Sequence, residues 1–376
     1  MEGKLKVAFF LTKSGNRRHV LQLKALEEAG FYPLVILFNT EPEKTYFYQK
    51  GLGKKLRFLS ISYEEGGRKI KLKVLRELIN LLKKEKIRAV LTHRFRLLKY
   101  LYLAKFFYKD LKIIFYPVVS GELKHLGRRL AFKVIKKSIS KIVVNSRALK
   151  EELCALKVVK PEEVEIIYSS VDPEEFSLDL TKFEARRYLR LPEGFYFGMV
   201  AKFRPEKDHQ TLLLAFKRFL DMGGKAYLLL VGDGPTKEET VKLAKKLQIS
   251  SLVIFAGEID PLQVPLYLRT LDVYVHSSYR EGMPLAVLEA LSSGLPIIAT
   301  EAEGLPDIFD CPYFFGYLVP KRNEVALAEA MWKIYNLPEK EREILGRNAK
   351  RRFEEDFSPE ALAKNTIRLF SEIFNS

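Results

Sequence analysis

The stretch DVYVHS (272–277), followed after three residues by EGMPLAVLE (281–289), says most about the fold of this chain. Its first part is a short apolar run, typical of a buried strand. Gly282 loosens the turn after that strand, and Pro284 fits the first position of a helix, where a missing N–H costs nothing. The segment therefore predicts a helix that begins at the carboxyl end of a buried strand.

The same segment has the chemistry of an anion site joined to a hydroxyl site. The unpaired N–H groups and the positive dipole end at a helix start suit a phosphate. Glu289 lies about 7 Å further along the helix axis, at 1.5 Å per residue, and its carboxylate can accept hydrogen bonds from a sugar or ribose diol. With Glu281 at the start of the turn, the segment predicts a site for both halves of a nucleotide sugar.

Short apolar runs alternate with longer amphipathic stretches, and this rhythm occurs twice along the chain. The runs are 6–11, 33–38, 88–92, 112–119, 141–145 and 164–168, then 195–201, 226–232, 252–257, 272–277, 296–300 and 316–319. Continuous apolar strands predict parallel sheets covered on both faces. We expect an α/β chain with two doubly wound, Rossmann-like domains that face each other across a ligand cleft.

Length and composition fit this division, because 376 residues with 47% apolar and 12% aromatic residues can form two cores. The N-terminal domain is predicted to comprise residues 1–170 together with a last helix, about 359–374, that packs back on it. The C-terminal domain is predicted to comprise residues 171–358, and the polar linker 169–191 separates the two.

The sequence predicts a cytoplasmic protein. It contains no run of 18 apolar residues, and the run at 7–11 is too short for a secretory signal. Cys154 and Cys311 form no metal or disulfide pattern, which favours a reducing compartment.

The net charge of +17 is unevenly placed. Residues 1–170 contain 37 Lys and Arg and 16 Asp and Glu, a net charge of +21, which leaves −4 for residues 171–376. This asymmetry indicates that the N-terminal half meets an anionic surface, either nucleic acid or a membrane leaflet. Solubility, or adaptation to a hot habitat, would explain it without a partner.

A second motif, AKFRPEKD (201–208), leads from the first strand of the C-terminal half into a predicted helix at 208–221. Lys202 and Lys207 are placed to stabilise the charge on a departing nucleoside diphosphate. Arg204 is a further candidate for this role. Alternatively, the motif is a solvated charged loop that binds no ligand.

Four motifs in register resemble the family 4 retaining glycosyltransferases of the GT-B fold. They are residues 202–208, VGDGP (231–235), the Glu-x7-Glu segment and SGLPIIAT (293–300). The N-terminal half matches more loosely, through Gly15, His93 and VVNSRALK (143–150).

The resemblance implies roles for individual residues. Lys207 and Lys202 would grip the donor diphosphate, Glu281 would face the donor sugar, and Glu289 would hold the ribose hydroxyls. The backbone of Gly282, Met283 and Leu285 would contact phosphate and sugar. Gly15 would let its loop approach the phosphates, and the candidate catalytic residues are Lys207, Glu281 and His93.

Three positions depart from the family pattern. Lys202 stands where Arg is usual, which keeps the charge and loses the bidentate fork. Pro284 removes one backbone donor. The loop that usually carries a His near the reacting sugar reads VVSGE (118–122), so that a polar role would pass to Ser120, Glu122 or His125.

The resemblance implies front-face transfer of a hexose with retention, in which the leaving phosphate takes the acceptor proton and no protein nucleophile is required. The sequence contains no Asp-x-Asp pair, and cationic side chains can stabilise the diphosphate, so we expect neither a metal nor a cofactor.

Residues 123–139 predict a basic amphipathic helix. Its cations are Lys124, Arg128, Arg129, Lys133, Lys136 and Lys137, and its apolar residues are Leu123, Leu126, Leu130, Val134 and Ile135. Either its apolar side simply packs on the sheet, or the helix also lies on an anionic bilayer with its cations towards lipid. Aromatic residues in 94–109 would add interfacial contacts. We therefore expect an enzyme peripheral to the inner face of the cytoplasmic membrane, with a lipid-linked or lipopolysaccharide-type glycan as acceptor.

Three other interpretations stay open at this point. A sugar-nucleotide epimerase would have the same fold, although no motif supports it. A nucleic-acid-binding protein would explain the basic half, yet the sequence contains no recognition motif. We therefore expect no nucleic acid as partner. An inactive scaffold protein would have the same fold without catalytic activity. The nucleotide base, the donor sugar, the acceptor and the oligomeric state are not encoded in a readable pattern.

Overall fold

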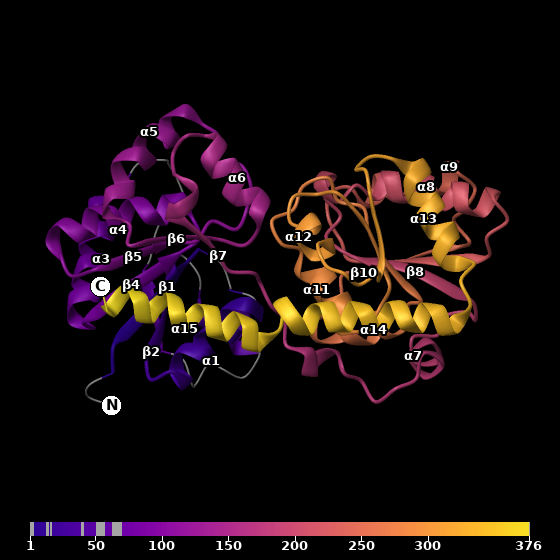
Figure 1. Cartoon of the computed structure of the whole chain (residues 1–376), viewed down its shortest axis with the longest axis horizontal. Coiled ribbons are helices and arrows are strands. Elements are labelled where there is room, and N and C mark those ends of the chain that lie inside the picture. The colour runs from indigo at the N-terminus through magenta and orange to yellow at the C-terminus, as the bar shows by residue number, and fades with distance from the viewer. Residues whose placement is uncertain are drawn as a thin grey trace. The chain divides into compact units, whose positions relative to one another are not determined.

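The computed structural model describes residues 4–12, 15, 17–38, 41–49, 57–61 and 70–375. The chain divides into two compact units (Figure 1), one of residues 1–170 with 359–376 and one of residues 171–358. Each unit has a parallel sheet with helices on its faces, as the continuous apolar runs predict.

The first unit contains a seven-stranded sheet in the order β3-β2-β1-β4-β5-β6-β7, and all its strand pairs are parallel. The strands are β1 (Lys6–Leu11), β2 (Tyr32–Phe38), β3 (Arg57–Ile61), β4 (Ile87–Thr92), β5 (Lys112–Phe115), β6 (Lys141–Val144) and β7 (Val164–Ile166).

Helices connect these strands. They are α1 (Arg17–Glu28), α2 (Tyr46–Gln49), α3 (Leu72–Lys84), α4 (Phe95–Phe107), α5 (Leu126–Ile135) and α6 (Arg147–Ala155), with 3-10 turns at Pro42–Lys44, Lys136–Ser138 and Pro161–Glu163. The last helix, α15 (Pro359–Asn375), packs against α1 in this unit, and the rings of Phe370 and Phe374 lie about 6 Å from that of Phe31, at 6.1 and 5.9 Å.

The second unit contains a six-stranded parallel sheet in the order β10-β9-β8-β11-β12-β13. The strands are β8 (Phe195–Val200), β9 (Ala226–Val231), β10 (Val253–Gly257), β11 (Val273–His276), β12 (Ile297–Thr300) and β13 (Gly316–Val319).

The helices of the second unit are α7 (Lys182–Tyr188), α8 (His209–Asp221), α9 (Lys237–Lys246), α10 (Val264–Arg269), α11 (Leu285–Ser292), α12 (Leu305–Phe309), α13 (Glu324–Tyr335) and α14 (Glu339–Asp356). Short 3-10 turns occupy Pro173–Phe176, Pro205–Lys207 and Pro261–Gln263. Helices α8 and α13 pack side by side over one face of the sheet, where Phe197, Phe216 and Met331 are fully buried.

The predicted doubly wound α/β architecture is confirmed, and several boundaries differ. Strand β3 was missed, because it is short and is flanked by polar residues. The predicted strand 112–119 ends at Phe115, since Pro117 cannot donate to a strand ladder. The predicted helix 123–139 is shorter, with α5 ending at Ile135 before a 3-10 turn.

Candidate functional site

The order of strands explains why two distant motifs meet in the second unit. Strands β8 and β11 are neighbours in the sheet, although β9 and β10 lie between them in the chain. The loop 201–208 follows β8, and the loop 277–284 follows β11. Both leave the same carboxyl edge at the point where the strand order reverses, which is where α/β sheets bind ligands.

Glu281 is the centre of the resulting network. The Lys207 ammonium pairs with its Oε1 atom. The same oxygen accepts hydrogen bonds from His276 Nε2 at 2.9 Å and from Ser278 Oγ at 2.7 Å. Oε2 of Glu281 accepts no hydrogen bond from the described residues, and so it stays available to a ligand hydroxyl.

The partners of Glu281 favour its ionised form. Burial favours the neutral carboxyl group, but the hydrogen bond and the charge interaction with His276, and then those with Lys207, outweigh burial and lower the pKa of Glu281 to about 2. Burial lowers the pKa of His276. At neutral pH the site therefore contains an ionised Glu281 carboxylate, held by the ammonium group of Lys207 and the imidazole of His276.

Two hydrogen bonds fix the backbone around Lys207. Ser277 Oγ donates to the Lys207 carbonyl at 2.9 Å, and the Tyr279 N–H donates to the Glu206 carbonyl at 3.0 Å. The next residue, Asp208, has a left-handed backbone (φ 49°) and caps helix α8 through its carboxylate. The loop after β8 is thus held against the loop after β11.

Helix α11 begins one residue later than predicted. Pro284 is its N-cap residue, with an extended ψ of 109°, and Leu285 is the first helical residue. The Glu281 N–H donates to Glu303 Oε2 at 2.8 Å, whereas the four N–H groups within residues 282–286 have no acceptor among the described residues. Because α11 lacks an acidic residue in its first turn, these donors remain available for an anion.

Gly304 holds this helix start in place. A Cβ atom on Gly304 would lie 1.7 Å from the carbonyl oxygen of Gly282, so only glycine permits the approach. Met283 is buried beside it, while Gly282 and Leu285 are half-buried.

The remaining predicted donor residues are placed differently from one another. Glu289 is buried on α11, one turn beyond the helix start. Lys202 is exposed, and its ammonium forms no ion pair with a described residue. Arg204 is exposed and lies 3.9 Å from Glu206, so that it is partly neutralised.

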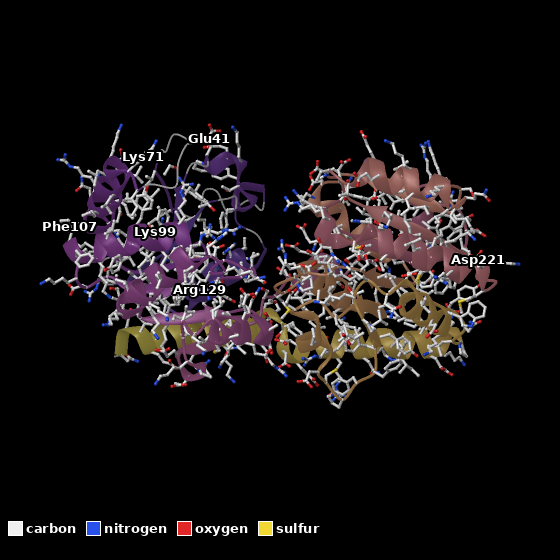
Figure 2. All side chains as sticks on the ribbon, turned by 90° about the horizontal axis from the view of Figure 1, so that it is seen from above. Glu41, Lys71, Lys99, Phe107, Arg129 and Asp221 are labelled. Atoms are coloured by element: carbon white, nitrogen blue, oxygen red, sulfur yellow. The ribbon has the colours of Figure 1, made fainter. Side chains whose placement is uncertain are left out.

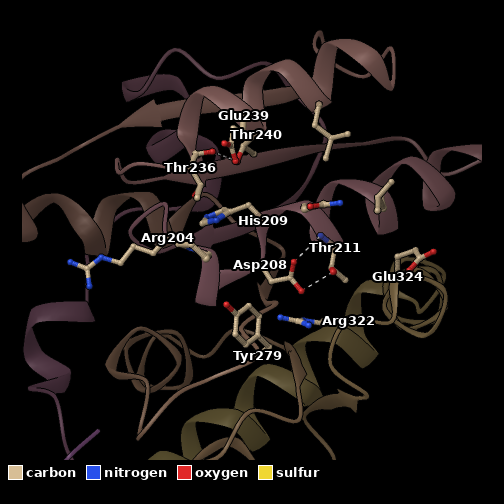
Figure 3. Close-up of a pocket in the computed structure, with 14 residues that line it drawn as sticks. Arg204, Asp208, His209, Thr211, Thr236, Glu239, Thr240, Tyr279, Arg322 and Glu324 are labelled. Carbon is tan, nitrogen blue, oxygen red and sulfur yellow. Dashed lines mark hydrogen bonds between the residues drawn. The ribbon is translucent and has the colours of Figure 1, made fainter. Parts of the chain in front are cut away.

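A cavity of about 660 Å³ adjoins the loop 204–209 (Figure 3), and α8, α9, Tyr279 and Arg322 line it. His209 stacks on the ring of Phe203 at 4.0 Å, and burial lowers its pKa to about 3. Its Nδ1 atom has no hydrogen-bond partner among the residues that the structure describes.

The first sheet brings a second set of residues together in the same way, since β1 and β4 are neighbours. His19, after β1, and His93, after β4, lie with their Nε2 atoms 2.7 Å apart. His93 Nδ1 donates to the Tyr116 carbonyl at 2.6 Å, so its Nε2 accepts from His19. Burial, and then the neighbouring Arg18, hold the pKa of both histidines well below the usual range.

Arg18 is a buried cation beside these histidines. Its guanidinium donates to Ser169 Oγ at 3.2 Å and lies over the ring of Tyr116, 5.1 Å from its centroid. No described carboxylate pairs with it. Gly15, in the loop before α1, has a left-handed backbone (φ 78°), and a Cβ atom there would collide with the ring of Phe47.

The basic helix differs from its prediction. Its exposed face carries the apolar residues Leu126, Leu130 and Val134, while Phe132 and Ile135 make the contact with the sheet. The expectation that the apolar stripe packs inward is therefore wrong for these three residues. Of the six predicted cations, Lys124, Arg128, Lys133 and Lys137 are exposed, Arg129 is half-buried, and Lys136 pairs with Glu163 at 2.8 Å.

The aromatic residues of α4 are also divided between the two sides. Phe106 and Phe107 are exposed at the end of the helix, and Phe107 is labelled in Figure 2. Tyr100 belongs to the core, where its hydroxyl accepts from the Lys71 N–H at 3.1 Å. Its predicted contact with an interface is wrong.

Sequence reasoning missed several partners. It assigned His276 no role in the donor site, although the imidazole forms a hydrogen bond with Glu281. It did not single out Ser278 or Arg18. The available signal was position, because His276 ends β11, Ser278 follows it closely, and Arg18 lies in the first turn of the helix after β1. The pairing of Ser278 with Glu281 depends on the path of the turn between them, which the sequence does not specify.

Two family profiles match this chain, one in each half. The family profile described as glycosyl transferases group 1 matches residues 181–352, and that of glycosyltransferase family 4 matches residues 14–175. The two matches together cover most of the chain, and the C-terminal one contains the whole Lys207–Glu281 network. The chain belongs to the family 4 glycosyltransferases, with the GT-B fold.

Individual family 4 relatives match over part of their length. The capsular polysaccharide biosynthesis glycosyltransferase CapM of Staphylococcus aureus is 26% identical over 228 residues, which cover 59% of this chain and 58% of CapM. The alpha-monoglucosyldiacylglycerol synthase of Streptococcus pneumoniae is 32% identical over 142 residues, 36% of this chain and 32% of that enzyme. The matched part is thus less than two thirds of either relative.

Solved structures of this fold match over almost the whole chain. The structure of HepE from Anabaena in complex with UDP and glucose has a TM-score of 0.82 at 17% identity, and the match covers 98% of this chain and 100% of that one. At this identity, the likeness shows the GT-B fold alone.

No helix in the described parts of the chain is both long and apolar enough to cross a bilayer. The described side chains include no group of three or more His, Cys, Asp or Glu residues that could hold a metal ion.

Proposed function

We propose that this protein transfers a hexose from a nucleotide diphosphate sugar to a glycan or lipid-linked acceptor, with retention at the anomeric carbon. The observation that carries the proposal is the convergence of Lys207, Glu281 and the open helix start of α11 at one edge of the second sheet. A cation, a carboxylate and free N–H groups match the diphosphate and the hydroxyl groups of such a donor.

The diphosphate would lie between the ammonium groups and the start of α11. Lys207 uses one of its three N–H donors for Glu281, which leaves two for phosphate oxygens. Lys202 adds an ammonium group that forms no ion pair with the described part of the chain. The backbone donors of Gly282, Met283 and Leu285 would bind the same oxygens or the sugar.

The hydroxyl groups of the donor would be held by the two carboxylates. Glu281 is ionised and acts only as an acceptor, and its free Oε2 can take a hydroxyl of the hexose. Glu289 lies further along α11, where the ribose diol would follow the phosphates. This division of roles is the one expected from the resemblance.

In the transfer, the bond between the anomeric carbon and the diphosphate oxygen breaks, and the acceptor oxygen forms its bond on the same face. The acceptor proton passes to the leaving phosphate oxygen. Lys202 and Lys207 stabilise the charge that develops on this group, and these cations make a metal unnecessary in the proposed mechanism. His93 and Gly15, at the carboxyl edge of the first sheet, stay candidates for contacts on the acceptor side.

We further propose that the protein works at the inner face of the cytoplasmic membrane, bound peripherally through α5. Leu126, Leu130 and Val134 are each more than half exposed and lie on one helix face beside Lys133 and Lys137. An apolar stripe flanked by cations on a solvent-facing helix suits the headgroup region of an anionic bilayer. The relative named as a glucosyldiacylglycerol synthase supports a lipid acceptor.

Transfer from labelled UDP-, GDP- and ADP-hexoses to a membrane lipid extract tests this function. NMR of the anomeric proton in the product then reads the stereochemistry. We expect an α-linked product from an α-linked donor. A β-linked product would contradict retention, and an unaltered lipid extract with every donor would contradict the lipid acceptor.

A further inference from the structure

A second cavity, of about 580 Å³, lies between α4 and α5 in the first unit. Its lining residues are Phe95, Arg96, Lys99, Glu122, His125, Gly127, Arg128 and Ala131. None of them belongs to the proposed donor site, which lies in the second unit.

The lining of this cavity carries an excess of positive charge. It includes three cations, Arg96, Lys99 and Arg128, against the single carboxylate of Glu122. Burial and then repulsion from the two guanidinium groups lower the pKa of Lys99. Lys99 therefore lies close to the guanidinium groups of Arg96 and Arg128.

The one carboxylate is already engaged. Glu122 Oε1 accepts from the Phe95 N–H at 3.0 Å, and its Oε2 lies 3.6 Å from Arg94. Arg128 donates to the backbone carbonyl of Glu122 at 3.0 Å, which does not neutralise its charge. Lys99 (Figure 2) forms no ion pair with a described residue.

Lining residues of the cavity are sequence neighbours of the apolar residues that α5 exposes. Leu126 stands between His125 and Gly127, which line the cavity, and Leu130 precedes the lining residue Ala131. An anion bound among the cations would therefore have an exposed apolar stripe next to it. A molecule with an anionic head and a hydrocarbon chain matches both features.

We propose that this cavity binds the phosphate headgroup of an anionic lipid, whose hydrocarbon chain lies along the stripe Leu126–Leu130–Val134. The site deepens the proposed function, because it places a lipid phosphate on the unit expected to receive the acceptor. It differs from the general attraction of a basic surface to a bilayer, since Lys99 and Arg128 would contact the phosphate directly.

The test compares two vesicle types in flotation assays at matched surface potential. Both contain phosphatidylcholine, with phosphatidic acid in one and oleate in the other. The Lys99→Gln/Arg128→Gln variant loses two cavity cations. The control, Lys124→Gln/Lys137→Gln, loses two exposed cations outside the cavity.

We expect the wild type to prefer phosphatidic acid by at least about fivefold, the factor expected for a single cation at a membrane surface. The cavity variant should bind both vesicle types equally, and the control should keep the preference while binding both more weakly. No preference in the wild type, or the same preference in both variants, would overturn the proposal.

Two further measurements distinguish lipid binding from phosphate binding, and loss of the cavity site from loss of folding. Stabilisation of the wild type by inorganic phosphate, lost in the cavity variant and without any vesicle preference, would assign the cavity to free phosphate and overturn the lipid assignment. Thermal shift by the donor nucleotide sugar shows that the cavity variant is folded. No thermal shift of the wild type by any donor would count against the proposed transferase function. The vesicle assay would still test lipid binding in the cavity independently.

Discussion

The Lys207 ammonium and the Glu281 carboxylate form an ion pair that joins the loop after β8 to the loop after β11. Both side chains are largely buried, and His276 and Ser278 complete the pairing of the same carboxylate oxygen. The two donor motifs are therefore one structural unit as well as one proposed site.

Removal of the cation should damage this unit. Lys207→Ala leaves the buried Glu281 carboxylate without its ammonium partner, and we expect a loss of about 3 kcal/mol in the free energy of unfolding. Denaturant unfolding measures it. Lys217→Ala, which breaks an exposed helical pair with Asp221, is the control and should change the stability by about 0.5 kcal/mol or less. Equal effects of both would contradict the buried network.

The depressed pKa of Glu281 predicts a dependence of stability on pH. Its folded pKa of about 2 lies below the ordinary value, so its ionised form stabilises the native state above about pH 4.5. This contribution is lost as the pH falls towards 2. The difference in unfolding free energy between wild type and Glu281→Gln should shrink by about 2 kcal/mol between pH 5 and pH 3. A difference that stays constant would show that the carboxylate is not stabilised.

The proposed ribose contact predicts a specific loss of affinity. Glu289→Gln keeps the shape of the side chain and removes its charge, and we expect donor affinity to fall about tenfold or more. Calorimetric titration with the donor measures this. Glu238→Gln on the exposed face of α9 is the matched control, with affinity unchanged. Unaltered affinity in Glu289→Gln would remove the carboxylate from the proposed site.

The close approach of two backbones predicts an effect of a single methyl group. Gly304→Ala would place a Cβ atom 1.7 Å from the Gly282 carbonyl and displace the start of α11. We expect a stability loss of about 1 to 3 kcal/mol together with weaker donor binding. Gly127→Ala has no atom within 4 Å of the added methyl and should be neutral or stabilising. Normal donor binding by Gly304→Ala would show that the helix start does not hold the donor.

The exposed stripe on α5 predicts a change in membrane binding without a change in stability. Leu130→Glu adds a negative charge to a position that is 57% exposed, and vesicle binding should fall at least about fivefold. Phe183→Glu, at an equally exposed site on α7, is the control. Equal flotation of Leu130→Glu and wild type would contradict the orientation of α5 towards lipid.

Much of the fold could be predicted because each buried strand is a continuous apolar run. The stretch 272–289 gave a strand, a turn and a helix, and only the first helical residue was misplaced, by one position. The order of strands was out of reach, since it depends on contacts between runs that the chain separates. That order is what brings Lys207 to Glu281 and His19 to His93.

The orientation of α5 shows a different limit. Helical periodicity predicted an apolar side formed by Leu123, Leu126, Leu130, Val134 and Ile135. The buried residues of α5 are Phe132 and Ile135, so the covered face overlaps the predicted side only in part. Which face is covered depends on the helix's place over the sheet, and so the exposure of Leu126, Leu130 and Val134 could be learned only from the structure.

The most direct test of the account is a thermal-shift panel of UDP-, GDP- and ADP-sugars with the wild-type protein. A donor at a large excess over its dissociation constant stabilises the native state by about 3 to 4 kcal/mol. The account predicts a strong rise in Tm with one nucleotide sugar and little change with the others. No rise with any member of the panel would contradict the claim that this site binds a nucleotide sugar.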